Sequence, residues 1–325
     1  MRRQIGARRP FAALLALLVG TVTLVVAPAA HAGTWGAYPS RVGARTCSNT
    51  KQHNGVSYQV CLDYNAARTR VRALALINPT AYTNFQVDIR MAYGGGGPVT
   101  AQSCPTMTTN GSRACWTGWS DMRLPYVVAD ATFGIAGTWM QTIRAVDTKL
   151  SGKAQEKSNY CGPASMQTLL ATMGISAPSQ DTLADQSKTT AAGTWHHDIP
   201  PTLNRYVSRD FPYTFISVPQ SGRESGLKRI ADSVSRGRPA IVLVKPGNLP
   251  WYPDGGELYR HYLVVHGFGG KISGGEAIPE QFKVWDPDAW DTTTGRKGKE
   301  EWLTVGQFMH AGKGTLLDDV WVITT

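Results

Sequence analysis

Cys161 is the residue of this chain best suited to nucleophilic chemistry. It lies in the segment AQEKSNYCGPASMQTLLATMG, residues 154–174, six residues after Gln155 and directly before Gly162-Pro163. Proline is tolerated in the first turn of a helix, and aliphatic residues follow at helical spacing, so the pattern predicts a helix that begins here. The unpaired amides and the dipole at a helix N-terminus favour an anion, and the thiolate is the reactive form of cysteine.

Gln155 supplies a second group that acyl transfer needs. When a thiolate attacks a carbonyl group, the carbonyl oxygen becomes negative, and an amide donor beside it stabilises that charge. We expect the side chain of Gln155 and the backbone amide of Cys161 to form this oxyanion hole. A single cysteine is more often a buried structural residue. The neighbouring glutamine and Gly-Pro pair favour the catalytic interpretation here.

A cysteine nucleophile needs a base and a group that orients the base. His261 and His266 flank the aliphatic strand pattern HYLVVH. They are five residues apart and therefore point to opposite faces of a regular strand, so both cannot serve one cleft. We predict that His261 is the base and that His266 is a packing or hydrogen-bonding residue. Asp286, at the end of the next strand pattern QFKVWD, is predicted to fix the tautomer of His261, with Asp288 as the alternative.

The elements that would position these residues follow a polar stretch over residues 148–158, which is suited to a linker. Helical patterns come first, near 161–174, 180–188, 198–208 and 224–236. Strand patterns follow, at 239–245, 261–268, 281–286 and 319–325. Helices followed by strands predict an α+β domain with an antiparallel sheet, here over residues 150–325.

The preceding residues 33–147 are predicted to form an all-β, sandwich-like domain. The segment NFQVDIRMAY, residues 84–93, alternates apolar and polar side chains, which is typical of a half-buried strand. Further strand patterns surround it, and no helical period of useful length is present. This domain shows no group of residues suited to chemistry.

Four cysteines of the β-rich domain are placed to form disulfides. Cys47 and Cys61 flank Asn54-Gly55, and Cys104 and Cys115 flank a second Asn-Gly pair in the same way. Asn-Gly is a strong hairpin signal, and folding at each turn brings the flanking cysteines close together. Three connectivities are open to four cysteines. We expect the pairs Cys47–Cys61 and Cys104–Cys115, which leaves Cys161 free.

Residues 1–32 have the features of a cleavable signal peptide. An arginine-rich start precedes an apolar run over 11–26, and Ala30-His31-Ala32 fits a cleavage site. The arginines allow either the secretory or the twin-arginine route. Removing the four leader arginines lowers the formal net charge from +10 to +6. The expected product is secreted or associated with the cell wall, with no further membrane span.

The sequence argues against two ligand classes, nucleic acids and metal ions. The chain has no basic run interleaved with aromatic residues, so nucleic-acid binding is not predicted. His196-His197 is the strongest metal-like pattern, but no H-E-x-x-H or C-x-x-C motif accompanies it. We therefore expect no metal and no other cofactor, and a protein or peptide as substrate.

Taken together, the candidate catalytic residues make this sequence resemble the bacteriocin-processing peptidase family, whose members cleave leader peptides after a double glycine. The resemblance is greatest to the stand-alone secreted relatives of that family among the papain-like cysteine peptidases. The resemblance rests on Gln155, the run 160–163 (Tyr-Cys-Gly-Pro), His261 at the start of an aliphatic strand and Asp286 before Pro287. It covers about residues 150–325. It implies a papain-like fold in which these residues are oxyanion donor, nucleophile, base and orienting acid.

Two departures from the leader peptidases shape what the resemblance implies. Tyr160 stands where those enzymes usually have aspartate, and no membrane spans or nucleotide-binding motifs follow the domain. The implied activity is therefore that of a freely secreted peptidase rather than of a transporter-linked leader peptidase.

Two other classes of function fit parts of the sequence. One is a different thiol acyl-transfer enzyme, such as a cell-wall amidase or endopeptidase or a transglutaminase-like cross-linker. The other is a catalytically inert binding protein. The β-rich domain is open to three roles: binding through Trp116, Trp119 and Trp139, covering the second domain as a propeptide, or structural support.

Overall fold

The structure, a computed structural model, describes residues 31–93, 98–122, 124, 126–219, 223–252, 260–312 and 320–325. The predicted signal peptide lies outside the described residues except for its last two. Residues 31–325 form one compact unit. Within the described ranges, no helix combines the length and the apolar character that crossing a bilayer requires.

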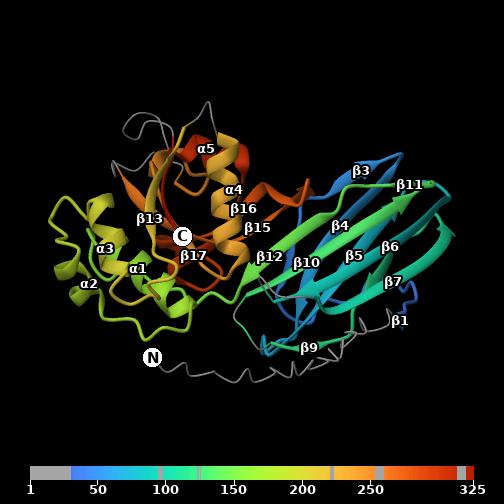
Figure 1. Cartoon of the computed structure of the whole chain (residues 1–325), viewed down its shortest axis with the longest axis horizontal. Helices are drawn as coiled ribbons and strands as arrows, with labels where there is room; N and C mark the ends of the chain where they lie inside the picture. Colours follow the sequence, from blue (N-terminus) through green and yellow to red (C-terminus); the bar gives the residue numbers. More distant parts are fainter. Residues whose placement is uncertain are drawn as a thin grey trace, which may run out of the picture. The chain divides into compact units, whose positions relative to one another are not determined.

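The described part of the chain before residue 149 contains strands and no helix (Figure 1). The strands are β1 (His31–Ala32), β2 (Arg45–Cys47), β3 (Lys51–His53), β4 (Val56–Tyr64), β5 (Arg70–Pro79), β6 (Thr83–Ala92), β7 (Pro98–Thr109), β8 (Arg113–Trp116), β9 (Ser120–Asp121), β10 (Tyr126–Ile135), β11 (Thr138–Trp139) and β12 (Ile143–Thr148). The clean alternation predicted for 84–93 is present, because Phe85, Val87, Ile89 and Met91 are buried while the residues between them are more accessible. One face of each strand therefore packs on a common core.

This core lies between two layers of strands. Strands β2, β4, β5 and β8 run in one sheet, and β7, β6, β10 and β12 run side by side in another. Buried residues from both sets make one cluster, including Leu62, Val71 and Phe133. Figure 1 shows β4 and β5 lying against β10 and β6.

Both expected disulfides are present, but one lies within a sheet and the other joins two sheets. Cys47 and Cys61 are opposite residues of the paired strands β2 and β4, with their Cα atoms 3.9 Å apart. Cys104 on β7 and Cys115 on β8 belong to different sheets, with a Cα–Cα distance of 6.2 Å. The second Asn-Gly pair therefore connects two layers and does not close a hairpin. Only the first pair, Asn54-Gly55, has both residues at positive φ.

The rest of the chain combines helices and strands. Its elements are α1 (Cys161–Thr172), α2 (Gln180–Gln186), the 3-10 helix η1 (His196–Asp198), α3 (Ile199–Leu203), β13 (Thr214–Val218), α4 (Arg223–Ser235), β14 (Ala240–Val244), the 3-10 helix η2 (Pro246–Asn248), β15 (His261–Ser273), β16 (Glu276–Asp291), β17 (Arg296–Thr304), α5 (Val305–Gly312) and β18 (Val320–Thr324). The first, second and fourth predicted helical regions correspond to α1, α2 and α4, and the third, 198–208, contains the shorter helix α3, which directly follows η1. Helices do not all precede strands, because β13 comes before α4 and α5 separates β17 from β18.

Helices cover both faces of the sheet that β14 and β15 form. On β14, Ile241 and Leu243 pack in a cluster with residues of α1, whereas Val242 and Val244 pack in a cluster with residues of α4. All five residues of β14 are buried. A strand with two buried faces reads as a continuous apolar run rather than an alternating one. This explains why the sequence AIVLV is apolar throughout.

The two halves of the chain share one sheet. Strand β12 pairs antiparallel with β15, from Ile143↔Lys271 to Asp147↔Gly267, so that β7, β6, β10, β12, β15, β14 and β18 run side by side. The polar stretch that follows β12 lies against α1. The backbone amides of Ser151 and Lys153 donate hydrogen bonds to the hydroxyl groups of Thr172 (3.0 Å) and Thr168 (2.9 Å).

Candidate active site

Cys161 is the first residue of α1 and is half-buried. The residue before it, Tyr160, caps the helix without a side-chain hydrogen bond. The first amides of the helix therefore have no side-chain partner at this cap, which leaves the N-terminus suited to an anion. Cys161 lines a pocket of about 560 Å³ together with Gln155 and His261.

Gly162 allows α1 to begin in this position. A Cβ atom at Gly162 would lie 2.4 Å from Oγ1 and 2.7 Å from Cβ of Thr194. Only glycine therefore permits such a close approach between the helix and the segment that carries Thr194. The glycine after the cysteine thus has a packing role that the sequence pattern does not reveal.

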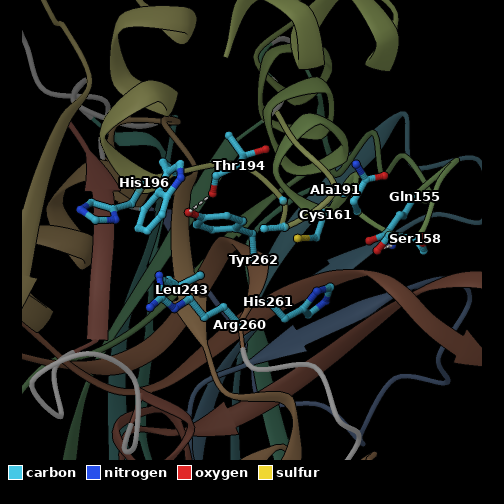
Figure 2. Close-up of a pocket in the computed structure, with 14 residues that line it drawn as sticks. Gln155, Ser158, Cys161, Ala191, Thr194, His196, Leu243, Arg260, His261 and Tyr262 are labelled. Carbon is cyan, nitrogen blue, oxygen red and sulfur yellow. Dashed lines mark hydrogen bonds between the residues drawn. The ribbon is translucent and has the colours of Figure 1, made fainter. Parts of the chain in front are cut away.

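His261 and Asp286 form a buried pair beside the thiol. His261 opens β15, Asp286 lies in the neighbouring strand β16, and His261 Nε2 is 2.7 Å from Asp286 Oδ1. The two residues are 1% and 0% exposed. Because Nε2 faces the carboxylate, Nδ1 is the ring nitrogen left for the thiol. Figure 2 shows the sulfur of Cys161 above the His261 ring.

Electrostatics favour a protonated His261. Burial alone lowers the pKa of His261, but the charge of Asp286, the hydrogen bond to Asp286 and a smaller contribution from Cys161 raise this pKa well above 6.5. Burial likewise acts to raise the pKa of Asp286, but the charge of His261 and the hydrogen bonds that the carboxylate accepts lower it to about 2. The pair is therefore an imidazolium–carboxylate pair at neutral pH.

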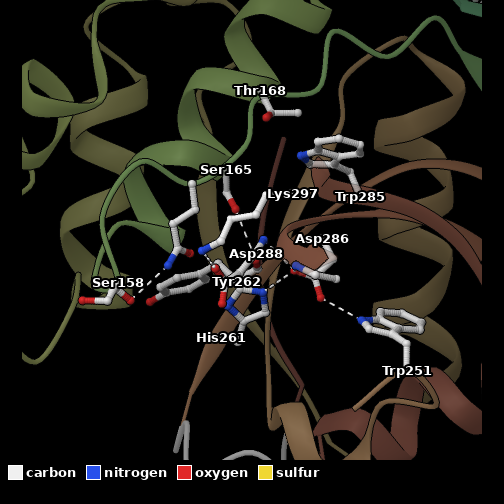
Figure 3. A network of polar contacts seen from close by, with 12 residues as sticks. Ser158, Ser165, Thr168, Trp251, His261, Tyr262, Trp285, Asp286, Asp288 and Lys297 are labelled. Atoms are coloured by element: carbon white, nitrogen blue, oxygen red, sulfur yellow. Dashed lines mark hydrogen bonds and ion pairs between the residues drawn. The ribbon is translucent and has the colours of Figure 1, made fainter. Parts of the chain in front are cut away.

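The Asp286 carboxylate is held from several directions. Oδ1 also accepts hydrogen bonds from the backbone amides of Asp288 (2.9 Å) and Ala289 (3.1 Å). Oδ2 accepts one from Trp251 Nε1 at 2.8 Å. Figure 3 shows Trp251 and His261 on opposite sides of this carboxylate. The alternative residue Asp288 instead pairs with Lys297 at 2.7 Å.

Gln155 lies close to Cys161 because the chain before α1 is anchored to β16. Its backbone amide donates to Pro287 O (2.8 Å), one residue after Asp286. Its side-chain Nε2 donates to Ser158 O (3.0 Å), whereas its Oε1 is buried without a partner. One hydrogen of the amide group therefore remains to donate into the pocket.

His266 lies elsewhere, as its position in the strand predicts. It is fully buried and does not line the pocket of Cys161. Its Nδ1 is 3.3 Å from Thr148 O, and its Nε2 is 3.4 Å from Glu300. Tyr160, the departure from the leader-peptidase pattern, faces α2, where its hydroxyl donates to Asp181 Oδ1 at 2.8 Å.

Two contributors to the site were not predicted in these roles. Trp251 lies in no predicted helix or strand, yet it donates a hydrogen bond to the Asp286 carboxylate. The Tyr252 ring lies 6.4 Å from the His261 ring. Both residues follow η2, in a connection without strand or helix pattern, so periodicity gives no signal for them. A Trp-Tyr pair in a connecting segment was the one available hint.

The fold is that of the papain-like cysteine peptidases, the class to which the protein belongs. Within that class, the chain belongs to the Peptidase_C39 like family, whose model matches residues 130–308. The protein is therefore a cysteine-type peptidase, and the resemblance seen in the sequence is confirmed. The match begins within β10 and so includes β12 and the four residues predicted for chemistry.

Among solved structures, the peptidase domain of Streptococcus ComA is similar to this chain. That protein is described as a bifunctional ABC transporter involved in a quorum sensing pathway. The match has a TM-score of 0.33 and 20% sequence identity, and it covers 54% of this chain and 96% of that chain. A search among curated proteins gives no match.

Proposed function

We propose that this peptidase hydrolyses peptide bonds with Cys161 as nucleophile, His261 as acid and base, Asp286 as the group that orients and charges His261, and Gln155 as oxyanion donor. The observation that supports this proposal best is the buried His261–Asp286 pair beside a thiol at a helix N-terminus. A histidine with this pKa can hold a proton next to a thiolate at neutral pH.

Acylation follows from the positions of these groups. The Cys161 thiolate attacks the carbonyl carbon of the peptide, and a C–S bond forms while the carbonyl oxygen becomes negative. Gln155 Nε2 and the Cys161 backbone amide donate hydrogen bonds to that oxygen. The C–N bond then breaks, and His261 Nδ1 transfers its proton to the leaving amine.

Deacylation uses the same groups in reverse. His261, now neutral, accepts a proton from water as the water oxygen attacks the acyl carbon. The C–S bond breaks, the acid product leaves, and the thiolate–imidazolium pair is restored. Asp286 is ionised in the thiolate–imidazolium state, where burial acts to raise its pKa but the charge of His261 and the hydrogen bonds to the carboxylate lower it to about 2.

We also propose that the enzyme acts outside the cytoplasm, after removal of residues 1–32, in extracellular fluid or at the cell wall. The leader-like sequence and the disulfides of the first half support this location. We further propose that residues 33–147 are a β-rich domain and 150–325 the peptidase domain, joined over 148–158. The strand-only content of the first segment supports this division.

Replacing Cys161 tests the catalytic proposal. Cys161→Ala should abolish hydrolysis of a broad peptide library, because it removes the sulfur that forms the proposed acyl intermediate, while the melting temperature stays close to that of the wild type. A peptide electrophile directed at thiols should label the wild type at Cys161. Full activity of the alanine variant would contradict the proposal.

A matched comparison separates this proposal from other acyl-transfer reactions. Wild type and Cys161→Ala would be incubated with peptides, with purified peptidoglycan, and with proteins bearing glutamine and lysine. Cleavage of peptides alone supports the peptidase proposal. Cysteine-dependent release of wall fragments or protein cross-linking, without peptide cleavage, would assign the thiol to a different acyl acceptor or donor.

A further inference from the structure

Flat rings line one side of the pocket beside Cys161. Trp195 and His196 both line it, and Trp195 is 47% exposed. The His197 ring stacks on Trp195 with centroids 6.0 Å apart and an angle of 23° between the planes. The Phe215 ring lies 4.7 Å from the His196 ring. We call these four residues the aromatic wall.

The rest of this part of the pocket is formed by buried or small residues, and the Tyr262 hydroxyl there already has a hydrogen-bond partner. Tyr262 is almost completely buried, and its hydroxyl donates to Thr194 O at 3.0 Å. Leu243, its cross-strand partner on β14, is also buried. The turn before Thr194 contributes only small residues, Ala191 to Gly193. An occupant would therefore meet mainly ring faces and methyl groups, together with the Arg260 side chain, which also lines the pocket.

The chemistry of the acyl intermediate indicates which part of a substrate reaches the aromatic wall. The attacked carbon has four substituents: sulfur, the oxyanion, the leaving nitrogen and the acyl-side Cα. The oxyanion points to Gln155, and the leaving nitrogen points to His261. Figure 2 shows Thr194, His196 and Tyr262 on the side of Cys161 opposite Gln155 and Ser158. The acyl-side Cα therefore points toward the aromatic wall.

The charge and the volume of the pocket restrict which substrate side chains it can accept. Burial, with smaller contributions from His197 and Arg260, lowers the pKa of His196, so this ring is neutral at neutral pH. Arg260 lines the pocket with its guanidinium 5.5 Å from the centroid of the Trp195 ring, and among the residues that the structure describes no carboxylate side chain lines it. These features disfavour a basic side chain. A pocket of about 560 Å³ has far more room than glycine needs.

We propose that the aromatic wall is the acyl-side subsite of this peptidase and that it takes an aromatic side chain from one of the two residues before the scissile bond. The substrate class is then proteins or peptides with an aromatic residue at that position. Stacked and edge-on ring contacts give such a side chain an advantage beyond its buried area. This inference rests on the catalytic role proposed for Cys161.

A positional-scanning library of peptides with a fluorogenic C-terminal amide tests the subsite, because only acyl-side residues vary. Wild type should cleave peptides with Phe, Tyr or Trp at one of the two positions at least about tenfold faster than peptides with Gly there, as expected for loss of ring contacts. Trp195→Ala should lower kcat/KM for the aromatic peptides about tenfold and leave the glycine peptides within about twofold. Trp195→Phe should retain most of the preference.

Two controls keep the inference separate from the proposed function. Trp139→Ala removes a tryptophan that is 51% exposed on β11 and does not line the pocket, so it should change neither rate. Alkylation of Cys161 by iodoacetamide should proceed at the same rate in Trp195→Ala as in wild type. A preference for glycine or for acidic residues, or an equal loss for all peptides in Trp195→Ala, would overturn the subsite. Equal cleavage by wild type and Cys161→Ala would instead overturn the catalytic proposal, and with it the subsite.

Discussion

At the scale of single residues, the Asp286 carboxylate accepts hydrogen bonds on both oxygens. Its Oδ1 is shared by His261 and two backbone amides, and its Oδ2 is bound by Trp251. A carboxylate with one mobile oxygen could rotate away from the imidazole. The indole N–H removes that freedom, so we propose that Trp251 is a positioning residue that acts through Asp286.

Trp251→Phe tests this role by deleting the N–H while keeping an aromatic ring. We expect kcat to fall about tenfold, the equivalent of one hydrogen bond to a charged group, with KM unchanged because Trp251 does not line the pocket. Steady-state kinetics provide the measurement. Trp290→Phe, on the same strand as Asp286 and 60% exposed, is the matched control. Equal losses in both variants would contradict the role.

The pH dependence of activity follows from the raised pKa of His261. The proposed mechanism needs the imidazolium, so activity should persist above neutrality and fall in alkaline solution as His261 loses its proton. Asp286→Asn removes the charge that raises this pKa and should move the alkaline limb of kcat/KM to lower pH. Asp288→Asn should leave it in place, because Asp288 pairs with Lys297. An unmoved limb in Asp286→Asn would refute this assignment.

Residue chemistry could be read from the sequence only where a local pattern accompanied it. Cys161 stands before Gly-Pro, His261 opens an aliphatic strand, and Asp286 closes the next one. The structure brings these three side chains together because β15 and β16 are neighbours and α1 packs on β15. Trp251 had no such pattern, and its hydrogen bond depends on the path of a loop, which periodicity does not encode.

At the scale of elements, α1 depends on one close contact. Gly162 faces Thr194, whose hydroxyl is also held by Thr189 at 2.7 Å. Rotation of the hydroxyl cannot relieve a clash at Gly162, because Thr194 Cβ itself would lie within 2.7 Å of the added atom. The position of the helix relative to the pocket therefore depends on the absence of one methyl group.

Gly162→Ala should separate α1 from the segment that carries Thr194. We expect a loss of about 1–3 kcal/mol in the free energy of unfolding, as for other overpacked cores, together with reduced activity because Thr194 borders the pocket. Denaturant unfolding and peptide hydrolysis measure the two effects. At Gly118 an added Cβ meets nothing within 4 Å, so Gly118→Ala is the control. An unchanged stability of Gly162→Ala would show that the helix can shift without cost.

Elements whose sequences have a clear hydrophobic pattern were predictable. Elements that form because they pair with a neighbouring strand were not. Helix α4 and the apolar strand β14 follow their sequence patterns closely. Strand β17 was not predicted, because its sequence RKGKEEWLT is highly charged and it forms a strand by pairing with β16. The pairing of β12 with β15 also escaped the sequence, since it joins residues more than a hundred positions apart.

At the scale of the whole molecule, a buried group of charges links the two halves of the shared sheet. Asp147 on β12 accepts a hydrogen bond from Thr46 (3.0 Å), and Lys283 on β16 lies 3.1 Å from Asp147 and 2.8 Å from Glu300. Lys283 is 5% exposed and Asp147 is fully buried. Burial acts to raise the pKa of Asp147, but the charges of Lys283, His266 and Arg68 lower it. The carboxylate is therefore ionised and depends on partners from both halves.

A buried ion pair costs desolvation energy, so its effect on stability is best judged by removing one partner. Lys283→Met should lower the free energy of unfolding by about 3–5 kcal/mol, because it leaves Asp147 charged and without its closest cation. Asp147→Asn should be similarly costly. The double variant should lose less than the sum of the two, since it leaves neither charge exposed to an apolar interior.

The matched control is a second lysine pair across the halves, Lys51 with Glu280, whose side chains are 26% and 22% exposed. Solvent screens that pair, so Lys51→Met should cost at most about 1 kcal/mol. Equilibrium unfolding of the four variants, followed by tryptophan fluorescence, gives the coupling energy between Asp147 and Lys283.

If Asp147 and Lys283 are coupled, the peptidase half and the β-rich half should unfold in one transition. The reason is that β12 and β15 cannot separate without exposing both charges. Additive losses of unfolding free energy, or two separate transitions in the wild type, would mean that the halves fold as independent units. The shared sheet would then contribute little to holding His261 in place.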